Sequence, residues 1–107
     1  MIIEFADDDI RLLIETGKSD NKLYKKLSRI PTFMRDLQMA YKLISIVGTT
    51  SELMKYKKLH YEKLKYDYQG KSSVRIGFTS KYRLIFEEYD NGIRVCLIEI
   101  NEHYGDK

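Results

Sequence analysis

The spacing of the apolar residues changes near Gly70, and this change constrains the fold more than any other feature of the sequence. Before Gly70, apolar side chains recur at the intervals of helices that bury one face. After Gly70 they alternate with polar residues, as in strands with one buried face. Helices followed by consecutive strands predict an α+β fold, in which the helices pack on one face of an antiparallel sheet.

Two short helices are predicted near the start of the chain. Residues 7–15 have acidic side chains in the first turn and end before Gly17, which can cap the helix. Ser19 or Asp20 can cap the second helix. Pro31 then ends that helix or opens the next one, because proline fits a first turn and not a helix interior.

The strongest helical pattern covers residues 32–47, and Gly48 follows it. Its apolar side chains share one face, which predicts that this helix packs against the sheet. One further turn is expected through Tyr56, capped by Thr50 or Ser51. The face of the long helix is formed by Phe33, Leu37, Ala40, Tyr41, Ile44 and Val47.

Strands are predicted at residues 2–5, 73–78, 81–88 and 93–100. Residues 90–92 read Asp-Asn-Gly, which is a hairpin turn signal between the last two. The expected architecture is therefore a short N-terminal strand and helices packed on a C-terminal antiparallel meander. Alternation within the strands places Arg75 and Arg83 together on the face away from the long helix.

Composition limits the class of protein. The 107 residues are 43% apolar and 33% charged, which predicts one globular domain over residues 1–107. One cysteine, Cys96, excludes an internal disulfide framework, and two histidines with it exclude an ordinary structural zinc cage. The apolar runs are far shorter than the roughly 20 residues of a membrane span, and no secretory signal precedes them. We expect a cytoplasmic protein that does not bind membranes.

Charge is distributed unevenly, although the formal net charge is only +3. Residues 1–54 carry eight basic and eight acidic side chains, residues 55–83 carry nine and two, and residues 84–107 carry two and six. The basic segment also holds several tyrosines, and cations with aromatic rings suit single-stranded nucleic acid. The alternative is a solvated lysine face beside half-buried strand tyrosines. The side chains expected to contact RNA are His60, Lys63, Lys71 and Lys81.

The motifs of nucleotide-dependent and metal-dependent enzymes are absent: there is no Gly-rich phosphate loop, HExxH, CxxC or GxSxG. We therefore expect no cofactor and no metal. Metal-free RNA cleavage needs a base for the 2′-OH, cations for the phosphorane and an acid for the leaving 5′-oxygen. Each candidate alone is also typical of a solvated surface, but together they supply these groups: Glu62, Lys65, Arg75, Arg83, His103 and Tyr104.

Several of these residues lie in ordered motifs within the segment from Lys58 to Tyr104. The motifs are Glu62, Leu64-Lys65, Gly70, Ser73-Val74-Arg75-Ile76, Tyr82-Arg83-Leu84 with Phe86, and His103-Tyr104. This segment resembles the C-terminal half of the RelE/ParE superfamily of toxin–antitoxin toxins, and most closely its YoeB and HigB branches. Residues 1–57 match that superfamily only in outline.

The resemblance implies a RelE-like microbial ribonuclease fold and a ribosome-dependent mRNA endonuclease. Glu62 matches the position of the general base. His60 is a second candidate for that role, because some relatives use a histidine in this loop. His103 matches the general acid, and Tyr104 matches the residue that stacks on or orients the substrate.

The same resemblance assigns roles to the cations. Lys65 and Arg83 match a clamp on the reacting phosphate, and Arg75 matches an arginine that contacts phosphate or orients the base. The connection between Arg75 and Arg83 is longer here than in the superfamily, which leaves the register of Arg83 open.

The implied partners are a cognate antitoxin protein, the ribosome, and mRNA in the ribosomal A site. A basic segment would also favour an acidic peptide laid across the site. Two other functions remain open. One is a non-catalytic topoisomerase poison of the ParE kind with the same fold, and the other is a nucleic-acid-binding module without activity.

Overall fold

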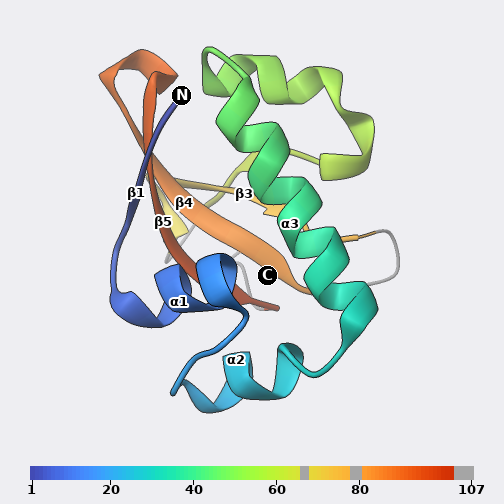
Figure 1. Cartoon of the computed structure of the whole chain (residues 1–107). Helices are drawn as coiled ribbons and strands as arrows, with labels where there is room; N and C mark the ends of the chain where they lie inside the picture. The colour runs from blue at the N-terminus through green and yellow to red at the C-terminus, as the bar shows by residue number, and fades with distance from the viewer. Residues whose placement is uncertain (66–67, 78–80, 103–107) are drawn as a thin grey trace.

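A five-stranded sheet forms the framework of the computed structural model, which describes residues 1–65, 68–77 and 81–102 (Figure 1). The strands lie in the order β1-β5-β4-β3-β2. Their bounds are Ile2–Phe5 for β1, Glu62–Lys63 for β2, Lys71–Arg75 for β3, Arg83–Tyr89 for β4 and Arg94–Asn101 for β5.

Within these residues, α-helices and short 3-10 turns connect the strands (Figure 1). The helices are α1, Asp8–Thr16, α2, Lys22–Leu27, and α3, Pro31–Ile46. The 3-10 turns include η1, Thr50–Lys55, η2, Lys57–Leu59, and η4, Asp90–Gly92. In the part of the chain that the structure describes, no helix is long and apolar enough to cross a membrane.

The predicted α+β fold is confirmed, with one addition at the edge of the sheet. Strands β2 to β5 pair antiparallel in chain order, as the meander requires. Strand β1 pairs with β5 in parallel, so the sheet is mixed. This pairing joins a strand near the start of the chain to one near its end. No local sequence pattern predicts a contact between residues so far apart in the sequence.

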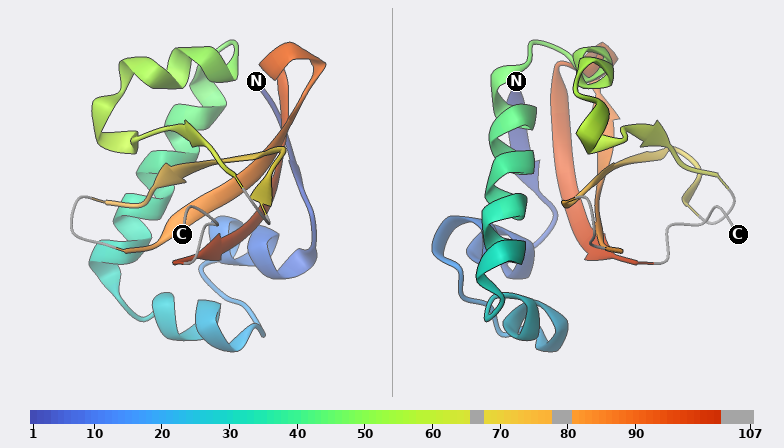
Figure 2. Two further views of the ribbon diagram at one scale, coloured as in Figure 1. Left: turned by 180° about the vertical axis from the view of Figure 1, so that it is seen from behind. Right: turned by 90° about the vertical axis from the view of Figure 1, so that its right-hand side faces the viewer.

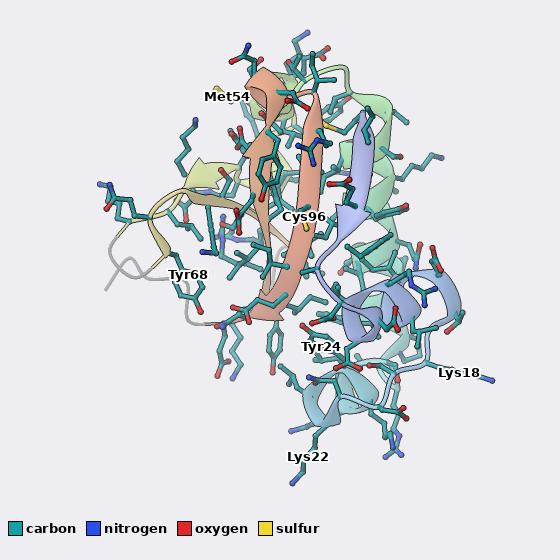
Figure 3. All side chains as sticks on the ribbon, turned by 90° about the vertical axis from the view of Figure 1, so that its left-hand side faces the viewer. Lys18, Lys22, Tyr24, Met54, Tyr68 and Cys96 are labelled. Carbon is teal, nitrogen blue, oxygen red and sulfur yellow. The ribbon has the colours of Figure 1, made fainter. Side chains whose placement is uncertain are left out.

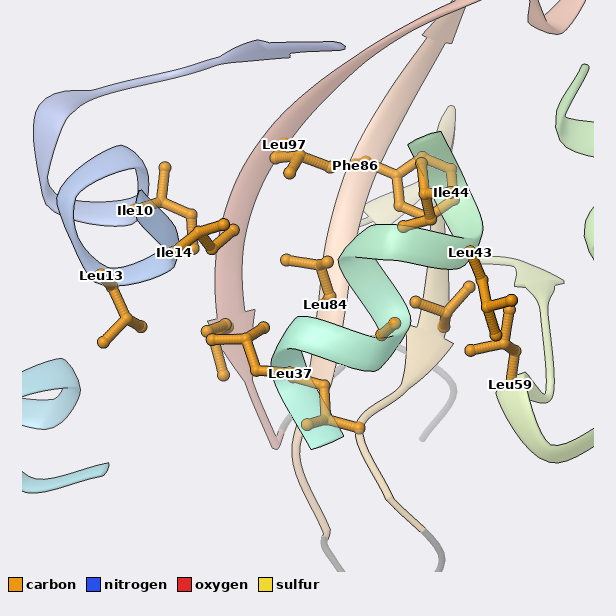
Figure 4. Packing of buried hydrophobic residues seen from close by; sticks show 14 of the residues in the cluster. Ile10, Leu13, Ile14, Leu37, Leu43, Ile44, Leu59, Leu84, Phe86 and Leu97 are labelled. Carbon is orange, nitrogen blue, oxygen red and sulfur yellow. The ribbon is translucent and has the colours of Figure 1, made fainter. Parts of the chain in front are cut away.

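The core lies between the sheet and α3, which crosses one face of it (Figure 2, right). Figure 4 shows Ile44 of α3 beside Phe86 of β4, and both side chains are fully buried. Val74 and Leu84 point to the same side from neighbouring strands, as their alternation predicted. Among the described residues, no α-helix covers the opposite face of the sheet, and that face positions the candidate site.

The helix ends follow ordinary capping chemistry. The Asp7 side chain accepts a hydrogen bond from the backbone N–H of Ile10, and Gly17 ends α1 in a left-handed conformation, φ 75°. The prediction of Ser19 or Asp20 as the next cap was wrong, because Asn21 caps α2 by accepting from the Tyr24 N–H. Pro31 occupies the first turn of α3, as predicted.

Thr49 caps η1, one residue before the predicted caps Thr50 and Ser51. The side chains of Thr49 and Glu52 form a capping box with the backbone, so Thr50 and Ser51 lie inside the turn. Thr50 instead points toward the β4–β5 turn, where a side chain on Gly92 would come within 2.5 Å of its hydroxyl.

The strand boundaries differ from the prediction around β3. Strand β3 begins at Lys71 and ends at Arg75, earlier than the predicted residues 73–78. Gly77 has φ +80°, and a Cβ there would lie 2.5 Å from the Asp36 carboxylate, so the backbone turns close against α3. Phe78 lies outside the described residues. The hairpin turn is confirmed, because residues 90–92 all adopt positive φ.

Candidate functional site

The face of the sheet opposite α3 carries most of the candidate residues. In Figure 2 (right), β2 and β3 extend from the sheet on the side away from α3. The strand register aligns Glu62 with Ser73, and Arg75 with Arg83. Paired residues on adjacent strands point to the same face. The two predicted arginines therefore share this face with Glu62.

Arg83 is the buried cation of this face, with only 2% of its surface exposed. Its Nε donates a hydrogen bond of 2.7 Å to the Ser73 hydroxyl, and its Nη2 donates one of 2.6 Å to the backbone carbonyl of His60. A buried guanidinium needs such acceptors because water does not solvate it. Arg83 therefore joins β4 to β3 and to the segment that precedes β2.

Glu62 supplies the negative charge next to Arg83. Its Oε1 lies 3.5 Å from the Arg83 Nη2, and its Oε2 lies 4.0 Å from the Nε2 of His60. The Glu62 side chain is 35% exposed and that of His60 is 55% exposed, so solvent reaches both. One carboxylate is thus held between a buried cation and an accessible imidazole.

His60 has an unusual backbone that contributes to this arrangement. It lies in the left-handed region, φ 47° and ψ 51°, where side chains other than glycine and asparagine are uncommon. The residue ends η2 just before β2, and its carbonyl is the one that accepts from Arg83. The turn at His60 therefore sets the direction in which β2 starts.

The other predicted cations near this face are more accessible than Arg83. Lys71 and Arg75 lie two residues to either side of Ser73 in β3 and point to the same face, and Lys65 is exposed after β2. Arg75 also lines a cavity of about 240 Å³ between η2, β3 and α3, together with Arg35 and Lys58. Asp36 lines the same cavity and lies 3.4 Å from the Arg35 guanidinium, so three cations and one carboxylate continue from the sheet face toward α3.

Two of the lysines predicted to contact RNA lie elsewhere. Lys63 follows Glu62 in the strand and lines a second cavity beside Tyr61 and Glu88 instead of the Arg83 face. The Lys81 Nζ lies 3.0 Å from a carboxylate oxygen of Glu102, and hydrogen bonding to that carboxylate raises the pKa of the Lys81 ammonium.

Tyr68 folds back over the same sheet face. Its hydroxyl donates to Glu99 at 3.1 Å and accepts from the Asn101 side-chain amide at 2.9 Å. Figure 3 labels Tyr68 on the side of the sheet that carries β2 and β3. The aromatic ring therefore stands beside the end of β5.

His103 and Tyr104, the predicted acid and stacking residue, lie outside the described residues. The chain is described as far as Glu102, directly after the β5 residue Asn101 that pairs with Arg83. Their roles stay predictions.

Two groups that hold this site were not assigned any role from the sequence. Ser73 is the hydroxyl partner of Arg83, and only its place in the Ser-x-Arg motif marked it. Glu88 holds the segment around Tyr61, and no motif includes it. Among the residues described, no group of three or more His, Cys, Asp or Glu is placed to hold a metal ion.

Together, the fold and this face define a small α+β protein with a solvent-accessible sheet surface opposite its longest helix, and this surface carries charges of both signs, because Glu87 pairs with Lys71 and Glu62 lies beside Arg83. No family model and no curated protein sequence matches the chain. A solved structure, a YoeB/ParE toxin from Agrobacterium tumefaciens, is similar over 97% of this chain and 100% of that one, with a TM-score of 0.54 and 17% identity. The resemblance to the RelE/ParE superfamily is therefore confirmed for the fold.

Proposed function

We propose that this chain is the toxin of a toxin–antitoxin system and acts as a metal-independent, ribosome-dependent mRNA endoribonuclease. One observation carries the proposal: the Glu62 carboxylate lies against the buried Arg83 guanidinium, beside the His60 imidazole, on an accessible face of the sheet. A base next to a cation is what attack by an RNA 2′-OH on the adjacent phosphorus requires.

Glu62 is the proposed base, with His60 as the alternative. The base removes the proton of the 2′-OH, and the 2′-oxygen then attacks the adjacent phosphorus. Both side chains are accessible and 4.0 Å apart, so either can approach the same hydroxyl. His60→Gly and Glu62→Gln separate the two, because each variant removes only one candidate base.

The cations stabilise the charge that builds on the phosphorane. Arg75 and Lys65 are accessible and can contact the phosphate directly. Arg83 is nearly fully buried behind Glu62. Its positive charge therefore stabilises the phosphorane without touching it. His103 donates a proton to the 5′-oxygen as its bond to phosphorus breaks, and Tyr104 stacks on a base.

The test is to induce the protein in growing cells and map the 5′ ends of cellular mRNA. We expect new ends within codons of translated messages. Glu62→Gln and His103→Ala should each lower cleavage by about 10²-fold, which is the scale expected for loss of a general base or acid. A matched control is Glu15→Gln, because Glu15 lies on α1 and pairs with Arg11 of the same helix. Intact mRNA on every translated message would contradict the proposal.

A ParE-like topoisomerase poison is the second candidate, because the similar solved structure is described as a YoeB/ParE toxin, a name that covers both kinds. This function predicts inhibition of gyrase supercoiling, and it predicts that Glu62→Gln and His103→Ala remain as toxic as the wild type. Measuring supercoiling in the same induced cells distinguishes the two functions.

An antitoxin is the proposed protein partner. The basic residues Lys71 and Arg75 of the site face, with the exposed Lys65 that follows β2, favour an acidic peptide. Expression together with the neighbouring gene should give a stable complex and restore growth. Harmless accumulation of the chain alone at high level would argue against this partner.

A further inference from the structure

Glu88 accepts hydrogen bonds from hydroxyls that three separate segments supply. The Thr50 hydroxyl lies 2.7 Å from its Oε1, the Ser72 hydroxyl lies 2.6 Å from its Oε2, and the Tyr61 hydroxyl also donates to Oε2. Thr50 and Ser72 are each only 3% exposed. One half-buried carboxylate thus joins η1, β3, β4 and the segment before β2.

The charge on Glu88 is stabilised where it lies. Burial opposes the ionised form, but the hydroxyls of Ser72, Tyr61 and Thr50, with the nearby Lys63, outweigh it and lower the pKa of this carboxyl. Burial and the carboxylate raise the pKa of Tyr61 to about 12. At neutral pH, Glu88 is therefore a full acceptor and Tyr61 retains the proton that it donates.

Tyr61 lies between the two candidate bases, His60 and Glu62. Its ring stacks on Phe86 with centroids 6.3 Å apart and planes 18° apart, and Phe86 is fully buried. Consecutive side chains of an extended segment point to opposite faces. Because Tyr61 points toward the core, Glu62 points toward the open face and Arg83.

The pairing of β2 with β3 is too short to hold its own register. It consists of two residue pairs and the bond from the Leu64 N–H to the Lys71 carbonyl, 2.9 Å long. A slip of one residue would exchange the faces of Glu62 and Lys63. Contacts outside the strand must therefore help to fix the register: the bond from Arg83 holds the backbone of His60, and the bond from Tyr61 to Glu88 holds the next side chain.

We propose that Tyr61 is a positioning residue, whose hydroxyl bond to Glu88 sets the register of β2 and so holds Glu62 against Arg83. Its effect on cleavage rests on the proposed function, but its effect on the register does not. Tyr61 itself touches no reacting atom in this role.

A matched pair of variants tests the proposal. Tyr61→Phe keeps the ring on Phe86 and removes the hydroxyl bond to Glu88. Thr50→Val removes a hydroxyl bond to the same carboxylate, but from η1, which does not carry a candidate base. Equal loss of stability is expected in both, so a difference between them reports the position of β2. Glu88→Gln, which weakens the acceptor for Tyr61, should act in the direction of Tyr61→Phe.

The first measurement is amide hydrogen exchange in the purified protein. We expect Tyr61→Phe to speed exchange at Leu64 by about tenfold, an opening of the β2–β3 pair worth about 1.4 kcal/mol. The amide of Leu37 in the core helix α3 should change equally in Tyr61→Phe and Thr50→Val, because it reports the loss of global stability that the two variants share. Thr50→Val should leave the exchange at Leu64 as in the wild type.

The second measurement is cleavage of mRNA on translating ribosomes. Tyr61→Phe should lower the turnover rate by about tenfold at an unchanged half-saturating ribosome concentration, because a misplaced base affects the chemical step and not binding. Thr50→Val should cleave as the wild type does.

The outcomes separate the two ideas. Faster exchange at Leu64 in Tyr61→Phe alone supports the register role, even if the wild-type protein cuts no RNA and the proposed function fails. Unchanged exchange in Tyr61→Phe, or an equal change in Thr50→Val, overturns the register role while leaving the nuclease proposal intact.

Discussion

At the scale of single residues, the structure gives the two arginines of the sheet face different roles. Arg83 is buried and bonded to Ser73 and to the His60 carbonyl, whereas Arg75 is partly exposed. Their strand positions are directly paired, so alternation alone treats them as equivalent. The two arginines differ in burial. Arg83 is covered by the segment before β2, which the alternating pattern of the strands does not include.

Removing Arg83 should therefore affect folding as well as cleavage. Arg83→Ala leaves Ser73, Glu62 and the His60 carbonyl without their cation, and we expect a loss of about 3 kcal/mol in the free energy of unfolding. Arg75→Ala should cost less than about 0.5 kcal/mol, since its side chain is accessible. Urea denaturation of the two variants checks this difference. Equal stability of both variants would show that the buried arginine is not a structural cation.

The left-handed backbone of His60 gives a second prediction at this scale. A Cβ is unfavourable in that conformation, so His60→Gly should be about 1 kcal/mol more stable than His60→Ala. Thermal denaturation measures the difference. Both variants lack the imidazole, so a gap in cleavage between them would come from the backbone direction of β2. A more stable alanine variant would show that this turn relaxes without glycine.

At the scale of elements, Glu88 predicts how stability depends on pH. The pKa of this carboxyl is lowered from the ordinary 4.5, so its stabilising contribution is complete above that pH and is lost as the pH falls toward the folded-state pKa. The wild type should lose more thermal stability than Glu88→Gln between about pH 6 and about pH 3.5. Parallel melting curves check this. Identical slopes for the two proteins would contradict the charged state of Glu88.

The elements show what the sequence could predict. The long helix and the β4–β5 hairpin were predicted correctly, because an apolar face and an Asp-Asn-Gly turn are local signals. Strand β2 was not predicted, because two residues carry no periodicity. The cap of α2 was misplaced because Ser19, Asp20 and Asn21 are all suitable caps, and only the chain direction selects Asn21.

The candidate site was predictable to the same extent. Motif spacing selected Glu62 and Arg83, and the structure places them 3.5 Å apart. Their supports, Ser73 and Glu88, could not be selected, because a hydroxyl or carboxylate gains its role only when distant segments meet. Lys63 is the opposite case. The charge pattern predicted that it contacts RNA at the site, but strand alternation turns its side chain away from the Arg83 face.

At the scale of the whole molecule, three cations and one carboxylate line the cavity where η2, β3 and α3 meet: Arg35, Lys58 and Arg75 with Asp36. Lys18 and Lys22 lie at the end that holds α1 and α2 (Figure 3). If RNA follows the first cluster, those charges release counterions on binding.

Salt dependence therefore tests this path. The test uses a Glu62→Gln background and measures the slope of log Kd against log salt concentration for single-stranded RNA. Each lost phosphate contact lowers this slope by about 0.7, so the double variant Arg35→Ala/Lys58→Ala should lower it by about 1.4. The double variant Lys18→Ala/Lys22→Ala removes the same charge and should leave the slope unchanged. Fluorescence anisotropy over a salt series measures both. Equal slopes for the two double variants would place the RNA elsewhere.

The parallel pair of β1 and β5 has a consequence for how the protein is made. Strand β5 lies between β1 and β4, yet the ribosome synthesises it last of the five. A nascent chain that lacks β5 holds β1 apart from the other strands, with its apolar residues uncovered. The five-stranded sheet can be completed only once β5 has left the exit tunnel, so β1 cannot join the other strands before that point in synthesis.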